Sequence, residues 1–321
     1  MRAAVAVSQD YDHPLDGLQV QEMPDPEPGP GSVKVHVRAA SLNMHDVWTL
    51  RGVGHPAEKL PRILGCDVAG VTDDGREVVV ASVIGDPSAG GGDETLDPRR
   101  TLVSENIDGA LAEQIVVPER NLIDKPAALS FEEAACLPTA WGTAFRMLFT
   151  RAGVRPGDRV LVQGASGGVN SAAITLAVAA GARVYATART PEKQEYARSL
   201  GAIPFASGGR LPERVEVVVD NVGAATWAHS LRCLKPGGLV VTCGATTGGA
   251  PDPELNRVFY QQLRVIGSTG ATRGEVESLL RFMADRDIHP HIDRVIGLDE
   301  VKDGFAAMIA GEFLGKIVVT P

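Results

Sequence analysis

The sequence predicts an α/β protein with two domains, a small β-barrel and a doubly wound parallel sheet. Its 321 residues are about twice the length of a usual single domain. The first third alternates apolar and polar residues with a period of two, whereas strands and helices alternate after Pro126. Residues 161–177 also read as a strand, a glycine-rich turn and a helix, which is typical of an open parallel sheet.

The strands of the first domain follow from this alternation. Val33, Val35 and Val37 alternate with basic residues, so one face of the strand is buried and the other is wet. Further strands are predicted at 2–8, 67–72, 76–84 and 112–118, separated by turn-rich stretches. Strands without intervening helices favour a small barrel.

The second domain begins with a helix over 130–150, where Ser130 and Glu133 have the spacing of a capping box. Continuous apolar runs such as 217–219 suit parallel strands that are covered on both faces. Strands are predicted at 158–164, 182–188, 215–222, 237–244 and 263–268, and helices at 168–180, 191–201, 224–234 and 273–286. The tail should add a helix and a last strand to the first domain. We therefore expect one domain from 1–125 with 288–321 and another from 126–287.

Composition narrows the functional classes. The net charge of −9 argues against a general nucleic-acid surface. No apolar run approaches the roughly 20 residues of a membrane span, and the amino terminus lacks the apolar core of a signal peptide. The four cysteines are scattered without paired spacing, which favours reduced thiols. We expect a cytoplasmic protein with a small-molecule substrate.

The glycine turn predicts a dinucleotide site. Gly164, Gly167 and Gly168 let the backbone approach a pyrophosphate at the positive end of the following helix, and Ser166 and Val169 belong to the same turn. Asn170 stands where the pattern has a third glycine, whose main role is close packing of helix on strand. We expect Asn170 to be tolerated, with an amide able to reach a phosphate oxygen.

The end of the second strand should select the cofactor. NAD sites place a carboxylate there for the ribose hydroxyls, yet no Asp or Glu occurs from Gly164 to Thr190. Arg189 and Lys193 occupy this region instead and suit a 2′-phosphate. NADP(H) is therefore favoured, the alternative being that both cations are solvated surface residues.

Six stretches in order carry a family resemblance: 41–48, 63–70, 109–126, 161–177, 220–248 and 313–321. Together they resemble the medium-chain dehydrogenase/reductase superfamily, in particular its quinone oxidoreductase and zinc-type alcohol dehydrogenase-like branch. The resemblance spans nearly the whole chain. It implies a GroES-like catalytic domain made from both chain ends, a Rossmann domain between them, and a homodimer formed through the strand at 263–268.

The resemblance also permits a test for zinc. Zinc-dependent members have ligands at three positions that here hold Asn43, Cys66 and, near the third, Thr139. A lone thiolate cannot build a tetrahedral zinc site. The family's structural zinc needs four cysteines in a lobe that corresponds to the cysteine-free loop 85–100. We expect no metal.

Without a Lewis acid, an enzyme of this branch is expected to reduce an activated C=C bond or a quinone with NADPH. Two roles fit Asn43: a donor to the substrate oxygen, or a residue that holds its loop. His45 is a candidate proton donor, and Asp46 is expected to fix the turn or contact the cofactor. The resemblance suggests a substrate pocket lined by Trp48, Cys66, Trp141 and Phe259, although each aromatic residue also fits a core position.

Further cofactor residues are implied by the matching motifs: Thr143, Asn221, Gly223, Gly244, Ala245, Thr246, Ser268, Thr269 and Lys316. The segment 203–214 is shorter than in relatives, which suggests that one strand-helix unit is missing. The alternative to a reductase is an NADP(H)-binding member of the same fold without net redox chemistry, such as a sensor or a lyase scaffold.

Overall fold

A computed structural model describes residues 1–321. The chain divides into two compact units, unit 1 with Met1–Gly142 and Ala271–Pro321, and unit 2 with Thr143–Gly270. Unit 2 is shorter at both ends than the domain expected from the sequence, 126–287, because the helices that precede and follow it belong to unit 1. Arg273, which begins α8 (Arg273–Ala284), donates its backbone N–H to Glu94 and its guanidinium to Leu122 O.

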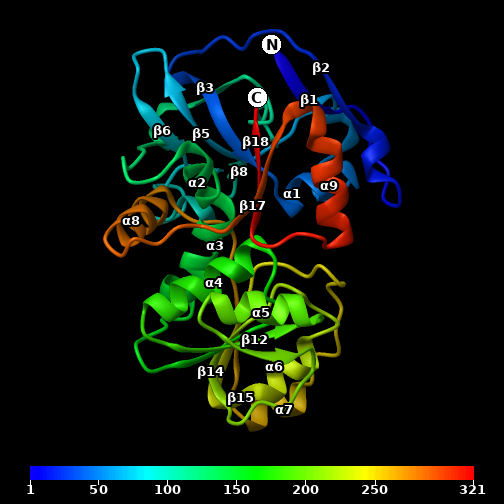
Figure 1. Ribbon diagram of the computed structural model, residues 1–321, viewed down its shortest axis with the longest axis vertical. Helices are drawn as coiled ribbons and strands as arrows, with labels where there is room; N and C mark the ends of the chain where they lie inside the picture. The colour runs from blue at the N-terminus through cyan, green and yellow to red at the C-terminus, as the bar shows by residue number, and fades with distance from the viewer. The chain divides into compact units, whose positions relative to one another are not determined.

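Unit 1 is built on a seven-stranded sheet of order β10-β6-β5-β3-β18-β17, with β9 paired to β3 (Figure 1). β3 pairs with β5 over most of its length, with β9 over its first half and with β18 at its end. The last strand of the chain pairs antiparallel with β3, so both chain ends contribute to one sheet. The strands are β3 (Ser32–Ser41), β5 (Asp67–Thr72), β6 (Glu77–Val80), β9 (Gln114–Pro118), β10 (Leu122–Asp124), β17 (Ile292–Gly297) and β18 (Lys316–Thr320).

Two smaller sheets and four helices complete this unit. One sheet has the order β2-β1-β4, and the other pairs β7 with β8. These strands are β1 (Arg2–Ala6), β2 (Leu18–Glu22), β4 (Arg62–Ile63), β7 (Val83–Ile84) and β8 (Thr101–Leu102). Besides α8, the helices are α1 (Met44–Leu50), α2 (Phe131–Ala135) and α9 (Val301–Ala310).

The helix expected over 130–150 begins as predicted, with Ser130 and Glu133 forming a capping box. It is not continuous, however. π-helical turns at Leu137–Trp141 and Arg146–Arg151 flank the short α3 (Gly142–Phe145), where unit 1 ends and unit 2 begins.

Unit 2 is a parallel sheet of six strands in the order β13-β12-β11-β14-β15-β16, which confirms the doubly wound topology. The strands are β11 (Arg159–Val162), β12 (Arg183–Ala188), β13 (Ile203–Ala206), β14 (Val215–Val219), β15 (Leu234–Thr242) and β16 (Arg264–Gly267). The helices are α4 (Gly168–Ala179), α5 (Pro191–Ser199), α6 (Trp227–Cys233) and α7 (Leu255–Tyr260).

The short segment after α5 differs from the expected loss of a strand and a helix. β13 is present and pairs with β12, so the sheet keeps its edge strand. Only the helix is absent, and residues 207–214 lead directly from β13 to β14.

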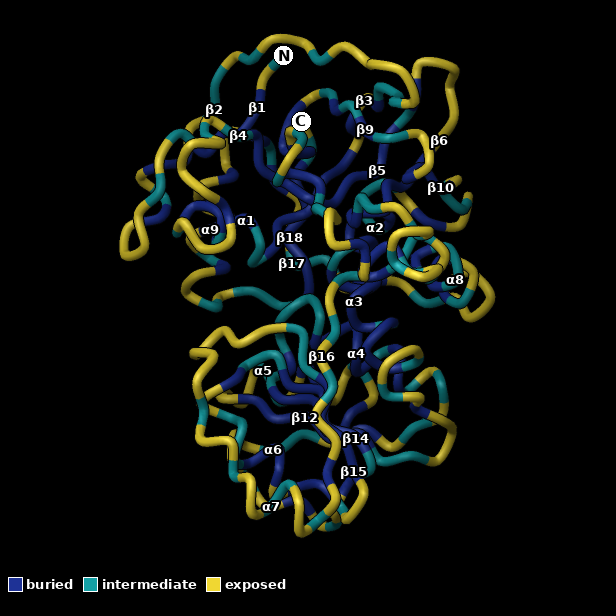
Figure 2. The backbone as a smooth tube through the Cα atoms, turned by 180° about the vertical axis from the view of Figure 1, so that it is seen from behind, coloured by how far each residue is buried: buried dark blue, intermediate teal, exposed yellow.

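Burial follows the layers of each unit. In unit 2 the central strands β11 and β14 are almost wholly buried, whereas α7 has no buried residue (Figure 2). No helix has both the length and the apolar character to cross a bilayer.

A charge cluster joins three neighbouring strands of unit 2 at their amino ends. Arg159 binds Glu216 through two of its nitrogens, at 2.6 and 2.9 Å, and donates to Glu213 at 2.7 Å. Tyr185 also donates to Glu213, at 2.6 Å. Hydrogen bonds from Tyr185 and Arg159 lower the pKa of Glu213 from 4.5 to about 2.

This cluster predicts acid sensitivity in unit 2. A carboxylate whose pKa is depressed by folding stabilises the fold above its ordinary pKa, and that stability is lost as the pH falls through the folded value. The melting temperature should therefore fall between pH 4.5 and about 2. Arg159→Met should lower the melting temperature at pH 7 and flatten this acid dependence, which thermal unfolding at several pH values would measure. Arg155→Met, at an exposed position, is the control, and equal pH profiles for both variants would contradict the prediction.

Candidate functional site

The buried carboxylate of Asp67 organises the polar side chains of unit 1. Asp67 begins β5 and is fully buried. Its Oδ2 accepts hydrogen bonds from Ser41 Oγ at 2.9 Å and Asn43 Nδ2 at 2.8 Å, and its Oδ1 accepts one from Thr139 N at 2.8 Å. Lys316 Nζ lies 3.5 Å from Oδ2. We call these five residues the Asp67 cluster.

Within this cluster the amide of Asn43 is fully used. Its Nδ2 donates to Ser41 O at 3.1 Å and to Asp67, while its Oδ1 accepts from Lys316 Nζ at 2.7 Å. Asn43 is 7% exposed. Both amide hydrogens already have acceptors, so of the two roles predicted for Asn43 the geometry supports the structural one, holding its loop.

Asp46 holds the start of α1, which is one of the two roles expected for it. Its Oδ2 accepts from Asn43 N at 3.0 Å in a capping box, and its Oδ1 accepts from Gly65 N at 2.8 Å. The side chain is fully buried, and this burial raises its pKa. Asp46 therefore joins α1 to the segment before β5.

His45 is the candidate whose ring is least engaged. The Nε2 atom has no hydrogen-bond partner, and the nearest carboxylate oxygen, Glu105 Oε1, lies 3.6 Å away. The other oxygen of Glu105 accepts from Thr101 Oγ1 and Leu102 N, which holds the carboxylate in place. Sequence reasoning missed Glu105, because no motif marks it and the contact joins distant segments.

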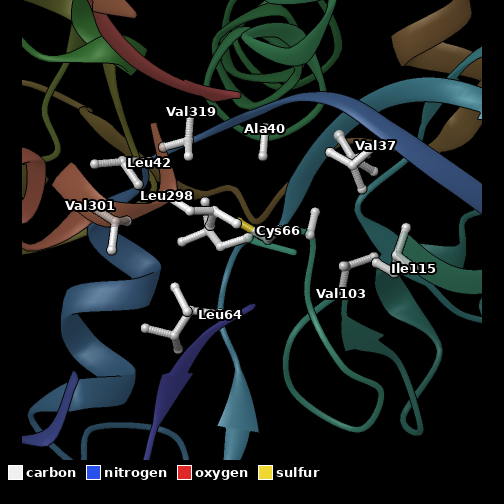
Figure 3. Close-up of a cluster of buried hydrophobic side chains, with 14 of the residues drawn as sticks. Val37, Ala40, Leu42, Leu64, Cys66, Val103, Ile115, Leu298, Val301 and Val319 are labelled. Atoms are coloured by element: carbon white, nitrogen blue, oxygen red, sulfur yellow. The ribbon is translucent and has the colours of Figure 1, made fainter. Parts of the chain in front are cut away.

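The predicted pocket residues have different surroundings within their own units. Cys66 is fully buried and belongs to the apolar core of unit 1, where its sulfur lies among Leu42, Leu64 and Leu298 (Figure 3). That burial raises the pKa of the thiol well above its ordinary value. Trp141 is also a core residue, whereas Trp48 is half-buried beneath the Arg51 guanidinium. Phe259 lies on α7 in unit 2 and is 68% exposed.

The three positions compared with zinc ligands do lie together. Thr139 Oγ1 is 3.4 Å from Cys66 Sγ, and both Thr139 and Asn43 bind Asp67. No group of three or more His, Cys, Asp or Glu side chains in residues 1–321 is arranged to hold a metal ion.

Lys316, expected near the cofactor, is bound within unit 1 to the start of α1. It is 3% exposed and belongs to unit 1, where its ammonium donates to Leu42 O at 2.8 Å and to Asn43. The third hydrogen of the ammonium faces Asp67 Oδ2, 3.5 Å from Nζ. The ammonium is therefore used to position the α1 loop, because its three donors already face acceptors.

In unit 2 the predicted cofactor residues follow the carboxyl ends of parallel strands. The ends of parallel strands share one edge of a sheet, which is where open α/β sheets bind ligands. Asn221 and Gly223 follow β14, Gly244, Ala245 and Thr246 follow β15, Ser268 and Thr269 follow β16, and Arg189 follows β12. Thr143 is buried at the start of the unit.

The glycine turn has a geometry that fits a phosphate group. Gly164 has φ +82°, the left-handed region that favours glycine. Gly167 is the N-cap of α4, and no side chain caps this end of the helix. A Cβ added at Gly167 would meet no atom within 4 Å, so this face of the turn is open. Uncapped N–H groups at an open helix start suit an anion.

Asn170 faces the sheet and not the open side of this turn. Its Nδ2 donates to Gln163 O at 2.9 Å, while its Oδ1 is buried without a partner. The side chain is therefore tolerated in the packed helix start, but the expected contact of its amide with a phosphate is not supported.

The two loops after β14 and β15 approach each other closely. Thr246 N donates to Asn221 O at 3.2 Å. Gly223 has φ +89°, and a Cβ there would lie 2.6 Å from Gly248 O. Glycine is thus required at 223 for these loops to meet.

Arg189 and Lys193 form a cationic pair beyond β12. Arg189 is exposed, and Lys193 lies in the first turn of α5. Burial and then the positive charge of Arg189 lower the pKa of Lys193. Both residues follow the carboxyl end of β12, the position at which sheets of this type recognise the ribose of a dinucleotide.

Comparison with known proteins agrees with this architecture. Residues 29–127 match the family described as alcohol dehydrogenase GroES-like domain, and residues 168–285 match zinc-binding dehydrogenase. An acryloyl-coenzyme A reductase from Metallosphaera sedula is 32% identical, over 95% of this chain and 96% of that protein. The chain belongs to the medium-chain dehydrogenase/reductase superfamily.

Solved structures of the superfamily have the same fold. An NAD-dependent alcohol dehydrogenase has a TM-score of 0.93 and 34% identity, with all of both chains covered. A crotonyl-CoA carboxylase/reductase, AntE, solved in complex with NADP, has a TM-score of 0.91 and 27% identity over 100% of this chain and 94% of that one.

The Asp67 cluster yields a prediction about stability. Lys316→Met should lower the free energy of unfolding by roughly 3–5 kcal/mol, because it leaves a buried carboxylate without its cation. Adding Asp67→Asn should recover part of the loss. Chemical denaturation measures both effects, with Lys302→Met as the control at an exposed site on α9. A loss no larger than that of the control would refute the role given to Lys316.

Proposed function

We propose that this chain is an NADPH-dependent reductase that acts without zinc. Its acceptor is an activated C=C bond, in an enone or enoyl thioester, or a quinone. The named relatives support this reaction type, since one reduces acryloyl-coenzyme A and another is a crotonyl-CoA carboxylase/reductase solved with NADP.

The cationic pair beyond β12 carries the choice of NADPH. No carboxylate is present from Gly164 to Thr190 to receive the ribose hydroxyls of NAD, and Arg189 stands beside Lys193 instead. A 2′-phosphate would bind between these cations. Gly164, Gly167 and the start of α4 would hold the pyrophosphate.

The independence from zinc rests on the three substituted ligand positions. Asn43 has committed its amide within the Asp67 cluster, and Thr139 is a neutral hydroxyl that faces Cys66. Cys66 is the only one of the three that could supply an anionic ligand, and one thiolate cannot build a tetrahedral zinc site.

The chemistry divides between cofactor and protein. Bound NADPH supplies a hydride. Reduction of a conjugated C=C bond places negative charge on the carbonyl oxygen and requires a proton at the α-carbon. His45 is the candidate proton donor, because its Nε2 has no hydrogen-bond partner in unit 1. Asn43 and Asp46 hold the start of α1, the helix that carries His45.

A panel of acceptors tests this proposal. Purified protein should bind NADPH more tightly than NADH and oxidise it, followed by absorbance at 340 nm, with crotonyl-CoA, an α,β-unsaturated ketone or a quinone. Addition of a zinc chelator should leave the rate unchanged. Arg189→Ala should raise KM for NADPH about tenfold or more through loss of a charge-assisted hydrogen bond, with little effect on KM for NADH.

Arg198→Ala is the matched control, since Arg198 lies at the other end of α5. Tight NADPH binding without turnover of any acceptor would favour an NADP(H)-binding protein without net redox chemistry. Absence of NADPH binding would overturn both readings.

We also propose a homodimer formed through β16. This strand is an edge of the six-stranded sheet, and Val265 on it is 48% exposed. Phe259 and Tyr260 on the neighbouring α7 are 68% and 77% exposed. An exposed apolar strand edge is a ready template for pairing with a second chain.

The dimer is tested by light scattering coupled to size exclusion. Val265→Asp should convert the dimer to monomer, because a buried charge at the strand edge is costly. Val295→Asp is a matched control on the edge strand of unit 1, where the valine is 50% exposed. Loss of the dimer in the control alone would place the interface on β17 instead.

A further inference from the structure

A chain of buried hydrogen bonds crosses unit 2 beneath the loops proposed to bind cofactor. Its centre is Gln163, the fully buried residue between β11 and the glycine turn. The amide has an acceptor and two donor hydrogens, which let one side chain bind neighbours on both sides of the central strand.

On one side, the oxygen of Gln163 faces the end of β12. Thr187 Oγ1 donates to Gln163 Oε1 at 2.9 Å and accepts from Gly164 N, also at 2.9 Å. Thr187 is 1% exposed. This hydroxyl therefore joins the first glycine of the turn to the strand that leads to Arg189.

On the other side, the nitrogen of Gln163 faces α6. It donates to Ser230 Oγ at 2.9 Å and to His229 Nδ1 at 2.8 Å. His229 Nε2 lies 2.9 Å from Gly209 O, so that nitrogen carries the hydrogen and Nδ1 is free to accept. The direction of each bond around Gln163 is thereby set.

Ser230 continues the chain to the loop after β14. Its hydroxyl donates to Asp220 Oδ2 at 2.6 Å. The other oxygen of Asp220 accepts from Val222 N at 2.9 Å and Gly223 N at 3.1 Å. Asp220 is 1% exposed, so its charge is satisfied by these groups and by Thr226.

We propose that Gln163 is a positioning residue that couples the two halves of the cofactor site. This proposal rests on the proposed function, in which Gly164 and Arg189 would bind the adenosine phosphates and Gly223 would face the nicotinamide. A ligand that orders the glycine turn also orders the side chain of Thr187, and one that orders the loop after β14 also orders Ser230. Gln163 contacts both side chains, so the order of one loop is passed to the other. Occupation of one half of the site then favours occupation of the other.

Half-cofactors measure this coupling directly. Adenosine 2′,5′-bisphosphate occupies the adenosine half, and reduced nicotinamide mononucleotide occupies the other. The dissociation constant of the mononucleotide, followed by fluorescence, should fall about fivefold or more when the bisphosphate is saturating. By linkage, the mononucleotide should tighten bisphosphate binding by the same factor.

Gln163→Met should reduce this coupling to less than twofold and raise KM for NADPH about tenfold, while kcat changes little. Gln261→Met is the matched control, an equal change at a partly exposed residue of unit 2. It should retain the wild-type coupling.

A double-mutant cycle with smaller side-chain changes distinguishes loss of coupling from loss of folding. Thr187→Val and Ser230→Ala each break one link, so each should remove the coupling and the pair should remove no more than either alone. Thr187→Ser keeps the hydroxyl and should keep the coupling.

The results distinguish the two proposals. If the wild-type protein binds NADPH but its half-cofactors bind independently, the role of Gln163 is overturned and the proposed reductase stands. Coupling that survives in Thr187→Val and Ser230→Ala also overturns it. Failure of the wild-type protein to bind NADPH overturns both.

Discussion

The hydrogen bonding of one buried carboxylate, that of Asp67, holds unit 1 together. Its two oxygens receive groups from β3, from the start of α1 and from the turn after α2, and they face the ammonium that begins β18. These segments span most of the sequence, yet they meet at one residue. An ionised carboxylate without these partners would be very costly to bury, so the segments are obliged to converge. The start of α1, where His45 lies, is consequently fixed by these contacts.

Unit 2 relies on a different principle, in which backbone geometry makes the site and buried side chains support it. The left-handed glycines at 164 and 223 leave N–H groups and loop contacts that side chains would obstruct. Beneath them, Gln163 and Asp220 satisfy polar atoms that the sheet cannot pair. Fully satisfied polar networks of this kind restrict loops to one arrangement.

Much of the fold was predictable, because its signals are local. A pattern of a few residues indicates each element: alternating valines for β3, a capping box at Ser130 for α2, and the glycine turn for the start of α4. That the second sheet is parallel and doubly wound followed from the alternation of strands and helices. The cations at 189 and 193 were equally visible, because they are fixed in sequence relative to the turn.

The partners of polar side chains were not predictable in the same way. The hydrogen bonds of the Asn43 amide with Lys316 and Asp67 join residues far apart in the chain, and no sequence spacing predicts them. The same is true of Lys316 itself, whose place beside the α1 loop depends on β18 pairing with β3. The burial of Cys66 in an apolar core likewise depends on how several strands pack. Such features become visible only when the tertiary contacts are known.

The connection between β13 and β14 gives a histidine of α6 a place in the buried network. Residues 207–214 contain no helix, so their carbonyl groups are not paired within helical turns. The carbonyl of Gly209 is bound by His229 Nε2. With the hydrogen on Nε2, Nδ1 is left to accept from Gln163, so one imidazole ring serves both the connection and the centre of the sheet.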